Sequence, residues 1–160
     1  IQWALGQDHS GPVEFIPQGY GGSPVQIHRY ANGVTVERVR TLDKGMIQFV
    51  GTRGTVWVAR NDFLETDPAP LAAAPLRAGP EPLYASDDHH DDFFQCIRTR
   101  RHPISDVEWG HRSASICHLV NIATDLRRPV RWDPVREEIL GDPIAARLLD
   151  RPRRAPYAAF

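Results

Sequence analysis

Lysine is nearly absent from this chain of 160 residues, since Lys44 is the only one among 19 Lys and Arg residues. Cysteine is also scarce: Cys96 and Cys117 are too few for a disulfide scaffold or a four-thiolate zinc site. The formal net charge is only -1, which argues against nucleic-acid binding through bulk positive charge. No apolar run approaches the roughly 18–20 residues that span a bilayer, which excludes a transmembrane helix.

The remaining composition is that of a globular protein. Hydrophobic residues make up 41% of the chain and charged residues 24%, so a core can be buried. The length suits one domain, and we expect residues 1–160 to form it. The few cysteines are compatible with a reducing compartment, so a cytoplasmic location is favoured.

The chain begins at Ile1, without a methionine and without the pattern of a signal peptide. Residues 1–6 have the character of the last turns of a helix that closes on Gly6. Because a domain rarely begins at the end of a helix, we expect this sequence to be a piece of a longer protein.

The first half of the chain has the alternating pattern of β-strands. Asn32-Gly33 joins two alternating runs and predicts a hairpin with a type I′ turn. A second hairpin is expected around residues 51–54. The predicted strands cover residues 13–16, 25–30, 34–39, 46–50 and 55–59. The four hairpin strands predict one antiparallel sheet with one covered face.

The second half has the character of helices, after a proline- and alanine-rich connection at residues 68–82. The predicted helices begin at Ser86 or Asp87 and run to Arg100, from Asp106 to about Leu126, and from Asp142 to about Leu149. Residues 130–132 form a short strand, and residues 151–157 an extended tail. The fold class is therefore α+β, an open and mostly antiparallel sheet with helices packed on one face.

Two predictions concern the buried faces of these helices. Phe93, Phe94 and Ile97 supply the apolar stripe of the first helix. The middle of the second helix, residues 114–123, is apolar on most sides and should be buried. His118 and Asn121 within it are then polar groups of the core with satisfied hydrogen bonds.

The sequence has no self-contained cofactor or nucleophile motif. Residues 19–22 are glycine-rich but lie between strands, whereas a dinucleotide fingerprint opens a helix. Residues 87–92, with the sequence DDHHDD, have ligand types suited to a metal. Carboxylates also stabilise the first turn of a helix without any metal. We favour that structural role and predict no metal site.

Two short segments carry candidate binding groups. His111 and Arg112 lie in the first turns of the second helix, where an imidazole and a guanidinium suit an oxygen-rich ligand. The structural alternative is that His111 packs and Arg112 pairs with Glu108 one turn away. Asp43 and Lys44 lie in a loop between strands, and a solvated turn is the plainer interpretation.

Several segments together resemble the C-terminal domain of Gfo/Idh/MocA oxidoreductases, the relatives of glucose–fructose oxidoreductase and inositol 2-dehydrogenase. Residues 46–56, MIQFVGTRGTV, resemble the strand–Gly-Thr-x-Gly–strand signature of that domain. The resemblance extends over nearly the whole chain. The other segments that carry it are residues 93–98, 101–103, 106–113, 131–134, 137–138, 141–142 and 151–157.

The resemblance implies an enzyme in which an N-terminal Rossmann domain binds NAD or NADP and carries the catalytic lysine. A catalytic histidine would immediately precede Ile1. Lys44 does not match the catalytic lysine, so this chain is expected to hold no catalytic residue and to bind no cofactor itself. The resemblance assigns to the chain contact with a sugar or polyol, through Asp43, Lys44, His111 and Arg112. It also implies contacts with the Rossmann domain and, through the sheet, with other copies in a homo-oligomer.

Three interpretations follow. In the first, the chain is the substrate-binding and oligomerisation domain of a sugar or polyol oxidoreductase, and is inactive alone. In the second, it is a stand-alone binding or assembly module of the same fold, without catalysis. In the third, it is an unrelated hydrolase or metal protein built around His89, His90 and the neighbouring aspartates.

Overall fold

The computed structural model describes residues 1–73, 84–151 and 154. The chain forms two compact units, one from Ile1–Arg38 and Ser86–Phe160 and the other from Val39–Ala85. Most of the predicted connection at 68–82 and of the predicted tail at 151–157 lies outside the described residues. Within the part that the structure describes, no helix has the length and apolarity needed to cross a bilayer.

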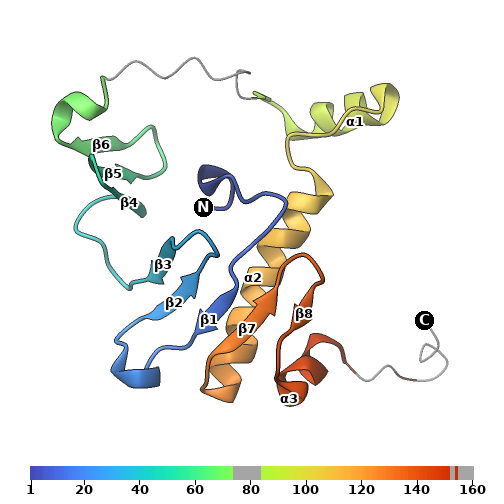
Figure 1. Cartoon of the computed structure of the whole chain (residues 1–160). Coiled ribbons are helices and arrows are strands. Elements are labelled where there is room, and N and C mark those ends of the chain that lie inside the picture. The colour runs from blue at the N-terminus through green and yellow to red at the C-terminus, as the bar shows by residue number, and fades with distance from the viewer. Residues whose placement is uncertain (74–83, 152–153, 155–160) are drawn as a thin grey trace. The chain divides into compact units, whose positions relative to one another are not determined.

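The first unit is built on a five-stranded antiparallel sheet of order β3-β2-β1-β7-β8 (Figure 1). This confirms the predicted open antiparallel sheet. The two-stranded ribbon β7–β8 extends it, and β8 was not expected from the sequence. The strands are β1 (Glu14–Ile16), β2 (Gln26–Arg29), β3 (Thr35–Arg38), β7 (Val130–Asp133) and β8 (Glu138–Ile139).

Helix α2 (Val107–Leu126) packs over β1 and β7 and covers one face of this sheet. Phe15 lies on that face, since it belongs to the buried cluster that includes Leu119 of α2. His28 and Val130 are its cross-strand neighbours on the same face. The short helix α3 (Pro143–Ala146) closes one end of the core. The buried cluster consists of Phe15, Leu119, Ile122, Ala123, Val130, Trp132, Ile139 and Ala145.

The opposite face of the sheet carries charge. Glu14 pairs in register with Arg29 and Arg131, so all three side chains share that face, and Arg29 Nη1 lies 2.8 Å from Glu14 Oε2. The register also places Ile27 and Val36 on opposite faces, since Val36 faces His28. The apolar residues of β2 and β3 therefore divide between the two sides of this sheet.

All three helices begin at an aspartate cap. Asp106 and Asp142 cap α2 and α3 through their carboxylates, as predicted. Helix α1 (His89–Thr99) begins slightly later than expected, because Asp88 rather than Ser86 or Asp87 accepts the free amides of its first turn. The helix Arg147–Leu149, labelled η4, extends α3 to the predicted end.

The predicted buried stripe of α1 is wrong. Phe93, Phe94 and Ile97 are 55%, 54% and 48% exposed. The inward side of this helix carries Asp92 and Cys96 instead. Asp92 Oδ2 accepts a hydrogen bond of 2.9 Å from the backbone amide of Ile104, which ties the helix to the segment after it.

The prediction for His118 and Asn121 is also wrong, because both are exposed. Only the side of α2 that carries Leu119, Ile122 and Ala123 meets the sheet. An apolar composition all round the helix suggested full burial, whereas the described unit covers one side of it.

The two predicted hairpins form, but the first uses another turn. Between β2 and β3 only Gly33 has a positive φ, 87°, and Asn32 Oδ1 instead accepts the amide of Val34. The amide of Tyr30 bonds to the carbonyl of Val34, and the amide of Gly33 bonds to the carbonyl of Tyr30. The loop between Tyr30 and Val34 therefore has three residues, 31–33, rather than two. The type I′ prediction is wrong for this reason.

The second unit contains a separate three-stranded antiparallel sheet of order β4-β5-β6. The predicted four-stranded sheet is therefore divided, with one hairpin in each unit. The strands are β4 (Ile47–Gly51), β5 (Gly54–Val58) and β6 (Leu64–Asp67). The sequence analysis missed β6, although Asn61 and Asp62, both at positive φ, make the tight turn before it.

Short 3-10 turns complete the described structure. Trp3–Leu5 (η1) ends at Gly6, whose φ of 64° is left-handed, which confirms the predicted helical turn and its glycine cap. Tyr20–Gly22 (η2) lies between β1 and β2. Ala69–Leu71 (η3) follows β6 in the second unit.

Candidate functional site

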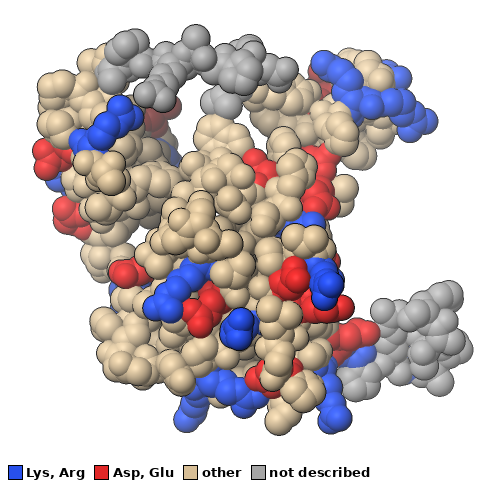
Figure 2. All heavy atoms as spheres, in the orientation of Figure 1, with Lys and Arg blue, Asp and Glu red and all other residues tan. Residues whose placement is uncertain are grey.

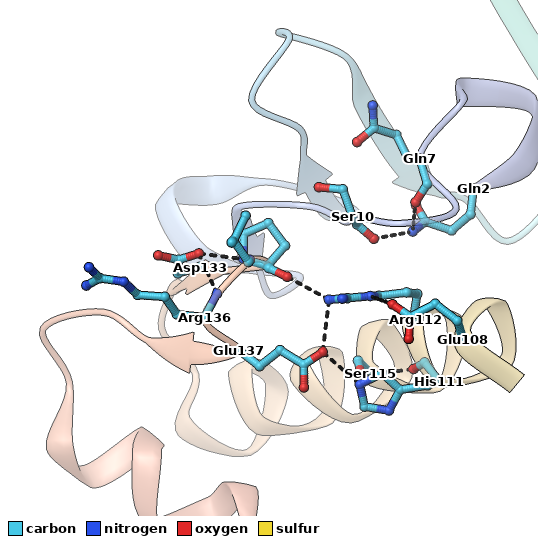
Figure 3. Close-up of polar contacts among 12 residues, drawn as sticks. Gln2, Gln7, Ser10, Glu108, His111, Arg112, Ser115, Asp133, Arg136 and Glu137 are labelled. Atoms are coloured by element: carbon cyan, nitrogen blue, oxygen red, sulfur yellow. Dashed lines mark hydrogen bonds and ion pairs between the residues drawn. The ribbon is translucent and has the colours of Figure 1, made fainter.

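The most concentrated polar cluster around a predicted site residue joins the start of α2 to the β7–β8 turn (Figure 3). His111 Nε2 lies 2.8 Å from Glu137 Oε1. Arg112 Nη1 lies 2.9 Å from the same oxygen. One carboxylate oxygen thus receives both predicted side chains, and it fixes how they are oriented relative to each other.

Arg112 is engaged on further sides as well. Its Nε donates to Glu108 Oε1 at 2.7 Å, and its Nη1 donates to the Pro134 carbonyl at 2.6 Å. The Arg112 side chain is 16% exposed. The pairing with Glu108 is the structural alternative considered above, and it occurs. Arg112 therefore has a structural role in the site, since its guanidinium binds Glu108, Pro134 and Glu137 of the protein itself.

His111 is the more accessible of the two. Its side chain is 48% exposed, and the bond to Glu137 engages Nε2. The ring has a second nitrogen, Nδ1, with which a neutral imidazole can make another hydrogen bond. Ser115 Oγ donates to the His111 carbonyl at 2.9 Å, one turn further along the helix.

The β7–β8 turn presents Glu137 in a left-handed conformation, with φ of 58°. Asp133 Oδ1 accepts the amides of Val135 and Arg136 at 2.9 and 3.0 Å, and these bonds lower the pKa of the Asp133 carboxyl. The amide of Glu137 bonds to the Asp133 carbonyl at 2.8 Å. Glu137 was not among the site residues predicted from the sequence. The one sequence feature that could have indicated it is its position just after the Asp133-Pro134 turn.

An open groove runs along the first turns of α2 and borders His111. It is lined by Ile104, Ser105, Asp106, Val107, Trp109, Gly110, His111, Ser113 and Ala114. Its lining combines an indole, small side chains and a few polar groups. Such a mixture suits a ligand with both carbon–hydrogen faces and hydroxyl groups.

Asp43 and Lys44 lie in the second unit, where they form a cluster of their own. Asp43 Oδ1 accepts both the indole N–H of Trp57, at 3.2 Å, and the backbone amide of Lys44, at 3.0 Å. The Lys44 ammonium lies 5.0 Å from the centre of the Trp57 ring and pairs with Glu65. The hydrogen bond to Glu65 raises the pKa of the Lys44 amine. The structure thus brings His111 together with Arg112 in the first unit, and Asp43 together with Lys44 in the second.

Charges of both signs are interspersed over the strands of the first unit. On the face seen in Figure 2, basic and acidic side chains alternate over β1, β2 and β7. No single-signed field covers that face, which agrees with the net charge of -1.

Comparison with protein families agrees with this architecture. The model of an oxidoreductase family, the C-terminal alpha/beta domain of the Gfo/Idh/MocA type, matches residues 1–159. No curated protein matches the chain significantly, and no solved structure does.

Proposed function

Because the chain belongs to the Gfo/Idh/MocA oxidoreductase family and has the architecture of its C-terminal alpha/beta domain, we propose that it binds the substrate of a sugar or polyol oxidoreductase and contributes to its assembly. The observation that carries the proposal is the family match over residues 1–159, which sets aside the interpretation as an unrelated hydrolase. In the proposed enzyme, NAD or NADP bound elsewhere would supply the redox chemistry.

The residues that the structure describes do not fit a dinucleotide site. The glycine-rich segment Tyr20–Gly22 is a 3-10 turn between β1 and β2, not the strand-to-helix turn whose amides bind a pyrophosphate. We therefore assign the cofactor to another domain. The task left to this chain is to bind the substrate, orient it and exclude water.

His111 is the proposed substrate contact of the first unit, with Arg112 and Glu137 as its support. A polyol offers hydroxyl groups that both donate and accept hydrogen bonds. The open groove beside His111 supplies the Trp109 ring, against which a sugar face can pack. Asp43 and Lys44 are the proposed contacts of the second unit, since both are exposed and carry opposite charges.

Assembly through the sheet is the second part of the proposal. In the described part of the first unit, α2 covers one face of the sheet, and the other face carries Glu14, Arg29 and Arg131. A two-fold related copy of such a face places acidic and basic groups opposite each other. Sedimentation of the purified protein at micromolar concentration should then give a dimer or a larger oligomer, and a monomer would contradict this part.

Kinetics on the whole encoded polypeptide test the substrate proposal. The protein is incubated with NAD⁺ or NADP⁺ and a panel of sugars and polyols, and the reduced nicotinamide is followed by absorbance. We expect turnover with at least one sugar or polyol. Activity only with substrates of another class, or none with any of the panel, would overturn the substrate class.

The role of His111 is tested separately by a matched pair of variants. His111→Ala should raise KM about tenfold or more, the cost of roughly one hydrogen bond to substrate. His118→Ala, on an exposed position of the same helix, should leave KM unchanged. Equal KM values for both variants would remove His111 from the site.

A further inference from the structure

A cluster at the start of α1 lies outside the site described above. Asp88, His89 and His90 each offer one ligand atom, and these three atoms all lie within 4.8 Å of one another. Among the residues that the structure describes, this is the group of three or more His, Cys, Asp and Glu side chains that converges in this way. Two of its three members are imidazoles, which distinguishes it from an ordinary acidic helix start.

The separations suit a small metal ion. His90 Nδ1 lies 3.7 Å from Asp88 Oδ1, and the two imidazole rings lie side by side with their centres 4.0 Å apart. An ion with tetrahedral bonds of about 2.0 Å keeps neighbouring ligand atoms roughly 3.3 Å apart. To bind an ion, these exposed side chains have to rotate to close the remaining difference.

Backbone amides hold the carboxylate of Asp88 in place through one of its two oxygens. Asp88 Oδ1 accepts the amides of His90 and Asp91 at 2.8 and 3.1 Å, which keeps the side chain beside the first turn. A carboxylate has a second oxygen, with which it can bind an ion.

The charge around the cluster also favours a cation. The N-terminus of a helix by itself attracts anions. Here Asp87 and Asp91, both exposed, add two carboxylates beside Asp88 and offset that effect. The imidazoles then select the class of ion, because nitrogen ligands suit copper, nickel and zinc better than magnesium or calcium.

We propose that Asp88, His89 and His90 form a surface site for one divalent transition-metal ion, with Cu²⁺ bound more tightly than Zn²⁺ and with water in the remaining coordination positions. The order follows the general affinity series of nitrogen and oxygen ligands. This proposal does not rest on the oxidoreductase function. It departs from the sequence-based prediction of no metal site, in which the acidic first turn only stabilises the helix.

The test is a titration of the untagged protein with Cu²⁺ and Zn²⁺, followed by calorimetry and, for Cu²⁺, by electron paramagnetic resonance. We expect one Cu²⁺ per chain with nitrogen ligands. The double variant His89→Ala/His90→Ala should bind Cu²⁺ about tenfold or more weakly. Alanine is a good helix former, so circular dichroism should show α1 intact.

Two single variants serve as controls. Asp88→Asn keeps the helix cap, since asparagine caps as well as aspartate, but removes the anionic ligand and should weaken Cu²⁺ binding. His118→Ala removes an exposed histidine elsewhere and should bind Cu²⁺ like the parent. The proposal is overturned if the parent binds no Cu²⁺, if the double variant binds it as tightly, if Asp88→Asn has no effect, or if His118→Ala alone removes the site.

Discussion

Arg128 and Asp142 form a two-pronged ion pair that fastens the end of α2 to the start of α3. Arg128 Nε and Nη2 donate to the Asp142 carboxylate at 2.7 to 3.0 Å. The same carboxylate accepts the amides of Ile144 and Ala145 at 3.2 and 3.0 Å. The Asp142 side chain therefore both caps α3 and pairs with the Arg128 guanidinium. The two roles can be separated by mutation.

Asp142→Ala should lower the urea midpoint clearly more than Asp142→Asn. Alanine removes both the cap and the ion pair, whereas asparagine keeps the cap. Arg128→Ala, at a partly exposed position, should fall close to Asp142→Asn. Equal midpoints for the two Asp142 variants would mean that the charge, not the cap, fixes α3.

Acid should destabilise the first unit through His28. Burial, and then the nearby Arg38 charge, lower the pKa of the His28 imidazole below its ordinary value of 6.5. The unfolded chain thus binds a proton before the folded one does, so stability is present above about pH 6.5 and is lost as the pH falls through the folded pKa. Unfolding in urea at several pH values measures this slope.

His28→Gln is the variant that checks the assignment. Its stability should depend less on pH below about 6.5 than that of the parent, since glutamine does not titrate. His9→Gln, at an exposed position, should keep the parental slope. An unchanged slope in His28→Gln would contradict the prediction.

Tyr30→Phe should cost about 1–2 kcal/mol in the free energy of unfolding at neutral pH. Tyr30 is 4% exposed, and its hydroxyl donates to Gln2 Oε1 at 2.5 Å. Gln2, itself 8% exposed, donates to the carbonyls of Gln7 and Ser10 (Figure 3), so the change leaves one buried acceptor without its donor. Urea unfolding, with Tyr20→Phe at an exposed position as control, measures the cost.

The same residue predicts a loss of stability in alkali. Burial raises the pKa of Tyr30 to about 12, against an ordinary value of 10.0. Stability is therefore fully present below pH 10 and is lost as the pH rises toward 12. The variant Tyr30→Phe should lack this part of the alkaline transition; an identical transition in both proteins would assign it to other groups.

Gly54→Ala should destabilise the second unit by about 2 kcal/mol or more. Gly54 has φ of 147°, and a Cβ there would lie 2.3 Å from the Asp67 carbonyl oxygen. Gly51→Ala is the matched control at the other end of the same turn, where the nearest atom would lie at 3.5 Å. Tryptophan fluorescence, to which Trp57 of this unit contributes, should report earlier unfolding for Gly54→Ala. Equal unfolding in both variants would contradict the steric argument.

Local signals predicted the elements well, and contacts between distant segments decided the rest. Asp106 and Asp142 were found because a cap acts within a few residues of its own position. The exposure of Phe93 and His118 depends on which sides of α1 and α2 meet other parts of the chain, and a helical period does not contain that information. The division of the strands into two sheets is likewise a matter of distant pairing.

Only part of the candidate site in the first unit was predicted from the sequence. His111 and Arg112 were selected from their position at a helix start, and the structure brings them together. Glu137, which holds both, is 26 residues from His111 in the sequence and belongs to another element. Its role depends on the left-handed turn at φ of 58°, a conformation that a glutamate rarely adopts and that the sequence pattern did not indicate.

The solitary ε-amine of Lys44 makes the second unit chemically addressable. Apart from a terminal α-amine, a reagent directed at primary amines has one target in these 160 residues, and that target lies 5.0 Å from the centre of an indole ring. A dye attached there would exchange energy with the nearby Trp57 and would report on the unfolding of this unit. The rarity of lysine thus supplies a single labelling handle without any mutation.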